Sequence, residues 1–269
     1  MSLPYWFETV LHKAVDNFYK YKPEPFPGEK KIANCKIVSH RGEHNDLGVL
    51  ENTLQAFDIA KDNQAWGIEF DVRWTRDLKP VVFHDEDLKR LYGKNVRICD
   101  TDLSELISFY PLIATLEEVI ERYGGKLHLM VEIKKEIYPE PILQGSILKN
   151  IFSSLKPQKD YHFISLFPEM FNLIDFEPLS AFIPISEFNI KHMSRLAVHK
   201  NFGGIFGHYI FLNDTYVRKH HRVGQITGTG YINSKNCLFR ELNRDIDLIF
   251  TNHARRLQSI RDACLLDNI

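Results

Sequence analysis

The chain has 269 residues, 44% of them hydrophobic and 26% charged, which is enough apolar side chain for one large core or two modest ones. This composition excludes collagen-like, low-complexity and disordered proteins. The 34 Lys and Arg residues balance 35 Asp and Glu residues at a formal net charge of −1, so no overall field recruits nucleic acid or an anionic membrane. We therefore expect no nucleic-acid partner, and any phosphate-binding site must be local.

The cysteines stand at wide spacings without a CxxC pair: Cys35, Cys99, Cys237 and Cys264. This spacing argues against a zinc cluster or a dense disulfide framework and fits a reducing compartment. Charged residues interrupt the first positions before an apolar segment can form, so we expect no secretory signal. No stretch approaches the ~20 apolar residues of a transmembrane segment. A cytoplasmic protein is the expectation.

The first segment has the pattern of a short amphipathic helix. Apolar residues recur at spacings of three and four from Phe7 to Phe18. Three prolines between Pro23 and Pro27 then favour an extended connector. We expect the helix to cap one end of the core, with a dimer or lipid contact as the alternative. The predicted organisation is an N-terminal helix and Pro-rich connector over residues 1–30 and a single domain over residues 31–269.

From Lys36 onward, short apolar runs rich in Val, Ile and Phe alternate with stretches of helical periodicity. The candidate strands are Lys36–His40, Gly67–Val72, Pro80–His84, Leu127–Ile133, Tyr161–Leu166, Leu179–Pro184, Gly203–Gly207, Val223–Thr229 and Ile246–Thr251. The helix candidates between them include Thr53–Asn63, Leu103–Tyr110, Thr115–Tyr123 and Pro141–Leu155. Strands separated by helices indicate βαβ units and a buried parallel sheet. Length and alternation predict an α/β fold, a single (β/α)8 TIM barrel.

The connection from Trp74 to Lys79 breaks this alternation. It is too short for a parallel crossover and must form a hairpin turn. One candidate strand is therefore expected to be a hairpin strand extra to the barrel.

Several strand candidates carry polar residues at one end: Ser39-His40-Arg41-Gly42, Glu69-Phe70-Asp71, Phe83-His84-Asp85 and Glu132-Ile133-Lys134. Residues two apart in a strand face the same side, so Glu69 and Asp71 share one face, and Glu132 shares one with Lys134. In a barrel this parity places the apolar residues between them against the helices and the charged residues inside. His128 has the parity of Glu132 but lies deeper, which favours barrel filling over a ligand role.

Three carboxylates that converge at one barrel mouth are costly unless a cation neutralises them. Oxygen ligands favour a hard ion, Mg²⁺ or Ca²⁺, over zinc. For either acidic pair alone, an ion-paired barrel interior is the better interpretation. Two such pairs beside His40 and His84, each at a strand end, favour a functional site.

These motifs, in this order, resemble the glycerophosphodiester phosphodiesterase family. The matching stretches are Val38–Gly42, Glu51–Phe57, Gly67–Asp77, Val81–Leu88, Thr115–Val119 and Glu132–Lys134. His-Arg-Gly alone is a weak signal, whereas the ordered set is very specific. The strong similarity covers about the first half of the chain.

The resemblance implies a TIM barrel with one divalent cation, Mg²⁺ or Ca²⁺, bound by three carboxylates: Glu69, Asp71 and Glu132. It implies that the catalytic acid and base are the two strand-end histidines: His40 and His84. It also implies that two cationic side chains contact the substrate phosphate: Arg41 and Lys134.

The chemistry agrees with these roles. A phosphodiester anion resists nucleophiles until its charge is neutralised, which a metal ion and an Arg side chain supply together. Cleavage then needs a base on the attacking oxygen and an acid on the leaving alkoxide, and imidazoles take both roles near neutral pH. We assign His40 as the base and His84 as the acid, and the reverse assignment stays open.

The similarity thins in the second half of the chain. Ser165 stands at the family's Ser-Phe position and Thr229 stands where the family has an asparagine, and we expect both at the lip of the substrate site. The last strand ends in Asn252 where an Asp is usual, and Leu50 replaces an expected proline. The segment Lys89–Leu112, where the family carries a substrate-covering insertion, is short. These departures leave the alcohol group of the substrate open.

We therefore expect a metal-dependent phosphodiesterase that hydrolyses glycerophosphodiesters to glycerol 3-phosphate and an alcohol by His/His acid–base catalysis. The short lid supports a second hypothesis, which is hydrolysis of larger lipids by a lysophospholipase D or sphingomyelinase D-like barrel. A third hypothesis is a catalytically inactive barrel that acts as a binding protein. The expected partner is a small-molecule phosphodiester, while membrane-surface contact and oligomeric state are left open.

Overall fold

The computed structural model describes residues 17–44 and 48–266. Most of the helix expected between Phe7 and Phe18 lies outside the described residues, and its described end, residues 17–21, is helical. No helix within residues 17–44 and 48–266 is long and apolar enough to cross a membrane.

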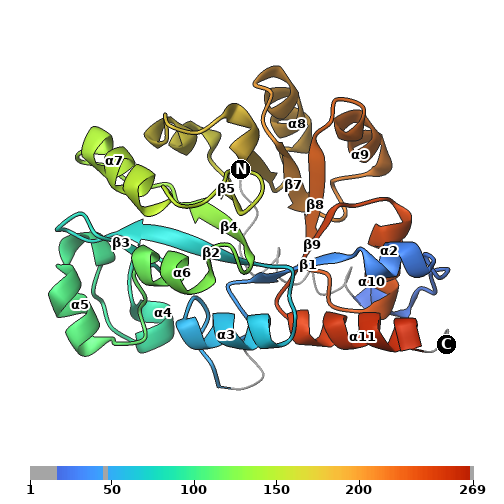
Figure 1. Cartoon of the computed structure of the whole chain (residues 1–269), viewed down its shortest axis with the longest axis horizontal. Helices are drawn as coiled ribbons and strands as arrows, with labels where there is room; N and C mark the ends of the chain where they lie inside the picture. Colours follow the sequence, from blue (N-terminus) through green and yellow to red (C-terminus); the bar gives the residue numbers. More distant parts are fainter. Residues whose placement is uncertain (1–16, 45–47, 267–269) are drawn as a thin grey trace.

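Eight parallel strands form a closed barrel, which confirms the predicted fold class (Figure 1). They are β1 (Lys36–His40), β2 (Gly67–Trp74), β4 (His128–Ile133), β5 (Tyr161–Ser165), β6 (Phe182–Ser186), β7 (Gly204–His208), β8 (Ile226–Gly230) and β9 (Leu248–Thr251). Pairing of β1 with both β2 and β9 closes the ring. The short strand β3 (Pro80–Val82) pairs antiparallel with β2 outside the ring, which confirms the extra hairpin strand.

Helices surround the barrel (Figure 1). They are α2 (Glu29–Ala33), α3 (Leu54–Asp62), α4 (Lys89–Tyr92), α5 (Leu103–Phe109), α6 (Leu116–Tyr123), α7 (Pro141–Ile151), α8 (Ile190–His199), α9 (Asp214–His221), α10 (Lys235–Asn243) and α11 (Ala254–Leu266). Side-chain caps set four of the described starts. Thr53 accepts from the Ala56 amide before α3, and Thr115 forms a capping box with Glu118 before α6; Asn213 and Ser234 cap α9 and α10.

Several predicted elements differ from the structure at their ends, among them a helix and a strand in the middle of the chain. Helix α7 ends at Ile151, and the remainder of the predicted helix up to Leu155 forms a turn. The run predicted as a strand from Leu179 begins instead with a single 3₁₀ turn over Leu179–Ala181, and β6 starts at Phe182. Pro178 precedes this turn, and Leu179 is half exposed, so its apolar side chain does not join the barrel wall.

Side chains fill the barrel interior in three layers. The middle layer is apolar and consists of Val38, Met130, Ile164, Ile183, Phe206, Leu248 and Phe250. Strand β8 contributes Gly228 to this layer, because a Cβ there would lie 2.6 Å from the Phe206 ring and 3.0 Å from the Phe250 ring. Polar layers lie on both sides, one at the strand starts and one at the strand ends.

The polar layer at the strand starts, the barrel base, contains two buried histidines. Nδ1 of His128 lies 3.0 Å from the Lys159 carbonyl oxygen, and Nε2 of His128 lies 2.8 Å from Nδ1 of His162. Both rings line a cavity of about 430 Å³ together with Lys36 and Trp66. His128 thus fills the base of the barrel rather than the mouth.

The described part of the N-terminal segment lies against the last helices of the barrel. Asn236 and Asn243 of α10 donate to the carbonyl oxygens of Lys20 and Pro25, at 2.8 and 2.9 Å. Helix α2 packs on α11. The division between residues 1–30 and 31–269 stays a prediction.

Candidate active site

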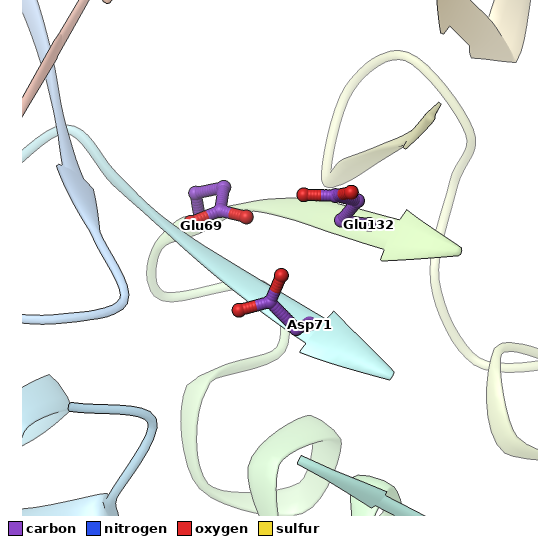
Figure 2. A group of neighbouring side chains, drawn as sticks. All are labelled: Glu69, Asp71 and Glu132. Atoms are coloured by element: carbon purple, nitrogen blue, oxygen red, sulfur yellow. The ribbon is translucent and has the colours of Figure 1, made fainter. Parts of the chain in front are cut away.

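Three carboxylates project into the barrel mouth from β2 and β4 (Figure 2). The register pairs Asp71 with Glu132, and alternation along β2 places Glu69 on the same inner face as Asp71. All three side chains are buried, and one oxygen of each lies within 4.8 Å of one oxygen of the other two. The sequence parity therefore produces the predicted acidic cluster.

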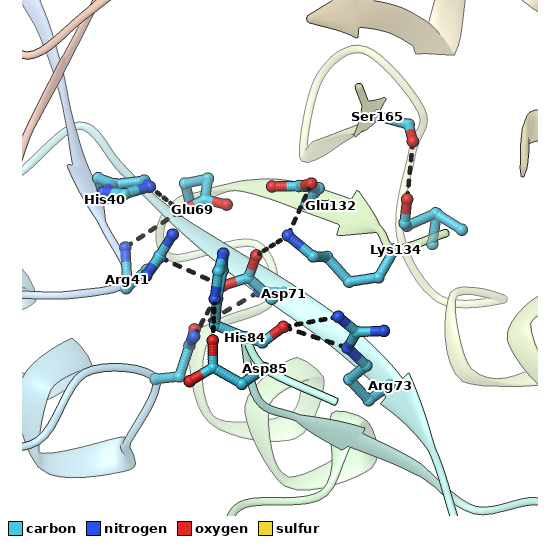
Figure 3. A network of polar contacts seen from close by, with 12 residues as sticks. His40, Arg41, Glu69, Asp71, Arg73, His84, Asp85, Glu132, Lys134 and Ser165 are labelled. Atoms are coloured by element: carbon cyan, nitrogen blue, oxygen red, sulfur yellow. Dashed lines mark hydrogen bonds and ion pairs between the residues drawn. The ribbon is translucent and has the colours of Figure 1, made fainter. Parts of the chain in front are cut away.

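Two cationic side chains contact this cluster (Figure 3). Nζ of Lys134 lies 3.1 Å from Oδ1 of Asp71 and 3.0 Å from Oε1 of Glu132. Nε of Arg41 lies 3.4 Å from Oδ2 of Asp71. Burial alone would raise the pKa of Asp71, but Lys134 and Arg41 together hold it well below its usual range.

The other two carboxyl groups have raised pKa values. Burial, together with the charges of Asp71 and Glu132, raises the pKa of Glu69 well above its usual range. Burial also raises the pKa of Glu132 to about 7 against the opposing effect of Lys134. When all three carboxyl groups are ionised, Lys134 and Arg41 leave one negative charge of the cluster surplus, which disfavours ionisation of the two glutamates.

The acidic cluster fits a hard divalent cation. Its donors are carboxylate oxygens only, which is the ligand type that Mg²⁺ and Ca²⁺ prefer. Oε1 of Glu69 is buried and has no hydrogen-bond partner among the described residues. A bound cation would satisfy this oxygen and neutralise the surplus charge.

His40 ends β1 beside the acidic cluster. Its Nδ1 lies 2.6 Å from Oδ1 of Asn252, just beyond β9, and its Nε2 lies 3.7 Å from Oε2 of Glu69. An amide oxygen only accepts hydrogen bonds, so Nδ1 carries the hydrogen and the neutral ring presents Nε2 as a lone pair. Burial and the neighbouring Arg41 lower the pKa of His40, which favours this neutral form.

His84 follows β3 and is held by a carboxylate. Its Nδ1 lies 2.8 Å from Oδ1 of Asp85, and Arg73 donates two hydrogen bonds to its backbone carbonyl oxygen, at 3.1 and 2.9 Å. The pKa of His84 is lowered, chiefly by burial, while the charge of Asp71 and the hydrogen bond with Asp85 oppose this shift. Asp85 therefore stabilises the protonated form of this ring.

Arg90 connects the two sides of the mouth. Its Nε donates to Oδ2 of Asp85 at 2.6 Å, and its Nη1 donates to Oε2 of Glu51 at 3.1 Å. Glu51 also accepts from Arg41 at 3.0 Å. This chain of ion pairs links the carboxylate that holds His84 with the guanidinium beside the acidic cluster.

The turn after β1 depends on unusual backbone conformations. Arg41 and Gly42 have φ values of 57° and 79°. A Cβ at Gly42 would lie 2.7 Å from Cβ of Ala56, so only glycine lets α3 approach. This turn brings Asn52 to the site, where Nδ2 donates to Oδ2 of Asp71 at 2.8 Å.

The structure does not bring Ser165 or Thr229 to the lip of the mouth. Ser165 is fully buried, and its hydroxyl donates to the Ile133 carbonyl oxygen at 2.7 Å and accepts from the Phe167 amide at 3.1 Å. Thr229 is also fully buried, on the face of β8 opposite to Gly228, toward α10. Both side chains lie behind the barrel wall because their strand parity faces the helices.

The remaining candidate residues do meet at the mouth: His40, Arg41, Glu69, Asp71, His84, Glu132 and Lys134 (Figure 3). Sequence reasoning missed the contacts that orient them. Asp85 follows His84 directly, and Glu51 and Asn52 belong to a matched motif, so a signal existed for these three. Asn252 was noted only as a departure from the usual Asp.

The segment between β3 and α6 forms a small lobe with its own apolar cluster: Val81, Phe83, Leu88, Ile98, Leu106 and Ile113. Helices α4 and α5 and the 3₁₀ turn Ile98–Asp100 build it. Arg90 of α4 reaches the mouth from this lobe.

Comparisons with known proteins point to one family. Residues 40–159 match the model of the glycerophosphoryl diester phosphodiesterase family. The Bacillus subtilis protein YhdW, whose name assigns it to the same family, is 30% identical over 205 residues, which cover 63% of this chain and 84% of YhdW. A human lysophospholipase D is 44% identical over 104 residues, which cover 38% of this chain and 32% of the human protein.

Among solved structures, the glycerophosphodiester phosphodiesterase of Thermotoga maritima superposes with a TM-score of 0.70. The sequences are 25% identical, and the match covers 85% of this chain and 98% of the Thermotoga chain. The similarity therefore extends well past the first half of the chain, to which the strong motifs are confined.

Proposed function

Because the chain belongs to the glycerophosphoryl diester phosphodiesterase family, we propose that it hydrolyses glycerophosphodiesters to glycerol 3-phosphate and an alcohol. The observation that carries this proposal is the arrangement of the two histidines beside the acidic cluster. His40 and His84 are each held through Nδ1 by an oxygen acceptor, which leaves Nε2 of each ring available for proton transfer.

We propose that Glu69, Asp71 and Glu132 hold one divalent cation, Mg²⁺ or Ca²⁺. When bound, this ion would supply Lewis-acid neutralisation of the phosphodiester charge. Arg41 and Lys134 have side chains 17% and 10% exposed and lie at the same mouth, where they would bind the phosphate oxygens and orient the scissile bond.

The partners of the histidines support the assignment of His40 as base and His84 as acid. Asn252 is uncharged and stabilises neutral His40 with a lone pair on Nε2, which can accept a proton from the attacking oxygen. Asp85 is a carboxylate and stabilises protonated His84, which can donate its Nε2 proton to the leaving alkoxide.

The test measures turnover of glycerophosphocholine by the His40→Ala and His84→Ala variants. The release of glycerol 3-phosphate is the readout. Each variant should lose at least about a hundredfold in kcat, while circular dichroism and thermal unfolding stay close to those of the native protein. His199→Ala, at the exposed end of α8, is the matched control and should keep native turnover. Full activity in both active-site variants would contradict the proposal.

A second candidate is hydrolysis of lysophospholipids or related larger lipid phosphodiesters. The 44% identity to a human lysophospholipase D over 104 residues favours it, as does the short lobe beside the mouth. To separate the two candidates, turnover of glycerophosphocholine is compared with turnover of lysophosphatidylcholine and of sphingosylphosphocholine. Each substrate is assayed in the presence of Mg²⁺ or Ca²⁺ and after removal of both ions by EDTA.

A further inference from the structure

A continuous row of rings extends from His40 along the rim of the barrel mouth. The centroid of the His40 ring lies 6.4 Å from that of Tyr231, which lies 5.5 Å from that of His208. The row continues to Phe211 at 5.9 Å and from there to Phe188 at 5.1 Å. We call Tyr231, His208, Phe211 and Phe188 the aromatic strip.

The topology places the aromatic strip at the mouth. Phe188 follows the end of β6, His208 ends β7 with Phe211 just beyond it, and Tyr231 follows the end of β8. All of these positions are at the carboxyl ends of parallel strands, on the same rim as His40. The strip therefore lies next to the ring of His40, a proposed catalytic residue, and spans the ends of three neighbouring strands.

The two end residues of the strip present apolar surface to the solvent, while His208 between them is buried. Phe188 is 46% exposed and Tyr231 is 44% exposed. Tyr231 also has a φ of 68°, a left-handed conformation that is uncommon for a bulky side chain. Exposed aromatic rings and a disfavoured backbone conformation beside a site are features that function commonly explains.

The opposite side of the mouth is charged. There Arg90, Asp85, Glu51 and Arg41 form the ion-pair chain between the β1–α3 connection and the segment after β3. A phosphodiester bound between Arg41 and Lys134 would thus have a polar surface on one side and an aromatic surface on the other. The two ester arms of the substrate are therefore expected to differ in polarity.

We propose that the aromatic strip binds the hydrocarbon chain of the substrate, so that the preferred substrate is a phosphodiester with one long-chain arm, such as a lysophospholipid. This inference rests on the proposed function and selects the second substrate class within it. Transfer of methylene groups from water onto the rings supplies the binding energy, which grows with chain length.

The first test measures binding without turnover. Calorimetry compares decylphosphocholine, kept below its critical micelle concentration, with hexylphosphocholine. The longer ligand should bind at least about tenfold more tightly to the native protein, and Phe188→Ala should reduce this preference several-fold. Phe188→Leu, which keeps an apolar side chain, should retain most of it. Equal affinity for the two ligands would overturn the inference whether or not the protein is a phosphodiesterase.

The matched control is Phe167→Ala. Phe167 is 39% exposed after β5 on the same rim, but its ring is stacked under Lys135 and forms no part of the aromatic strip. This variant should keep the native preference for the longer ligand. An equal loss in Phe167→Ala and Phe188→Ala would indicate general adsorption of lipid to the rim and would overturn a defined chain-binding strip.

The second test measures turnover of monomeric lysophosphatidylcholines with acyl chains of six, eight and ten carbons, beside glycerophosphocholine. In the native protein kcat/KM should rise with chain length, and Phe211→Ala should flatten the rise. If the protein turns over glycerophosphocholine and kcat/KM for the lysophosphatidylcholines does not depend on acyl length, the proposed role of the strip is wrong while the phosphodiesterase activity stands. Absence of turnover on every substrate would instead overturn the proposed function, and the calorimetric comparison would still decide the strip.

Discussion

Oδ1 of Asn252 lies 2.6 Å from Nδ1 of His40, although 212 residues separate them in the chain. The contact exists because β9, the last strand, pairs with β1 and closes the barrel. An amide at this position fixes the ring orientation of His40 and its neutral tautomer without adding a charge to the acidic mouth. The pairing of β9 with β1 therefore both closes the barrel and places the group that orients the proposed base.

Asn252→Ala should lower kcat for glycerophosphocholine by roughly tenfold, which corresponds to about 1.4 kcal/mol in the activation free energy. KM should change little, because Asn252 acts through His40 and contacts no substrate group in the proposed arrangement. Asn252→Asp should recover part of the loss, since a carboxylate also accepts from Nδ1. Asn236→Ala, which removes the hydrogen bond from α10 to the Lys20 carbonyl oxygen, is the control. An unchanged kcat in Asn252→Ala would show that this contact does not orient the base.

Arg90→Ala should lower kcat by roughly three- to tenfold, because it releases both Asp85, which holds His84, and Glu51, which holds Arg41. Arg90→Lys should rescue only part of this loss, since an ammonium cannot reproduce the guanidinium fork. Arg97→Ala, which removes exposed ion pairs with Glu86 and Asp100 in the same lobe, should leave kcat native. Equal kinetics of the Arg90 and Arg97 variants would argue against the linkage.

Ser165→Ala should reduce the free energy of unfolding by roughly 1–3 kcal/mol, because the buried Ile133 carbonyl and Phe167 amide both lose their partner. Urea denaturation measures this change. A lip residue would behave differently and would alter KM without a loss of stability. A native unfolding midpoint together with a changed KM would therefore favour the lip role expected from the sequence.

Mg²⁺ or Ca²⁺ should raise the melting temperature of EDTA-treated protein, since a ligand that binds only the folded state at a hundred times its Kd stabilises it by about 2.7 kcal/mol. Asp71→Asn should abolish most of this increase, because it removes one of the clustered carboxylates. Glu241→Gln changes a buried carboxylate that Arg244 binds outside the mouth, and its increase should remain native. If Asp71→Asn retained the full increase, the cation would bind elsewhere.

The protein should lose stability as the pH falls from about 6.5 toward 4, in part because of the histidines at the barrel base. Burial lowers the pKa of His128 to about 4 and of His162 to about 3, and the charge of Lys36 adds to both effects. Below pH 6.5 the unfolded chain binds more protons than the folded chain, so protonation favours unfolding. The free energy of unfolding should be lower at pH 5 than at pH 7.5 by roughly 2 kcal/mol from His128 alone.

His162→Gln keeps hydrogen-bonding capacity beside His128 but removes one titrating ring. Its loss of stability between pH 7.5 and pH 5, from chemical denaturation, should be smaller than that of the native protein. His199→Ala provides the comparison, because His199 is exposed at the end of α8. Identical pH dependence in the native and His162→Gln proteins would place the acid sensitivity elsewhere in the chain.

Much of the fold and of the acidic mouth could be predicted from the sequence because both depend on local patterns. Runs of Val, Ile and Phe marked the strands, and the alternation around Glu69, Asp71 and Glu132 placed these carboxylates inside the barrel. The same parity rule could have excluded Ser165, which shares its strand face with Tyr161 and Phe163 of the outer core. That expectation was drawn from the family resemblance instead.

The contacts between distant strand ends could not be predicted in this way. Asn252 reaches His40, and the aromatic strip forms, only after eight strands close into a ring with a defined register. Nothing in the spacing of Phe188, Phe211 and Tyr231 indicates that their rings form one row. Short-range periodicity determines which face a side chain occupies, whereas closure determines which of these side chains become neighbours.

The apolar middle layer has a consequence for how the two ends of the barrel behave. At Gly228 the rings of Phe206 and Phe250 leave too little room for a methyl group, and hence too little for a water molecule. A layer packed this tightly leaves no path for a water chain, and hence for proton transfer, between the buried carboxylates of the mouth and the imidazole pair of the base. Protons can therefore reach each end of the barrel interior only from its own side of the barrel.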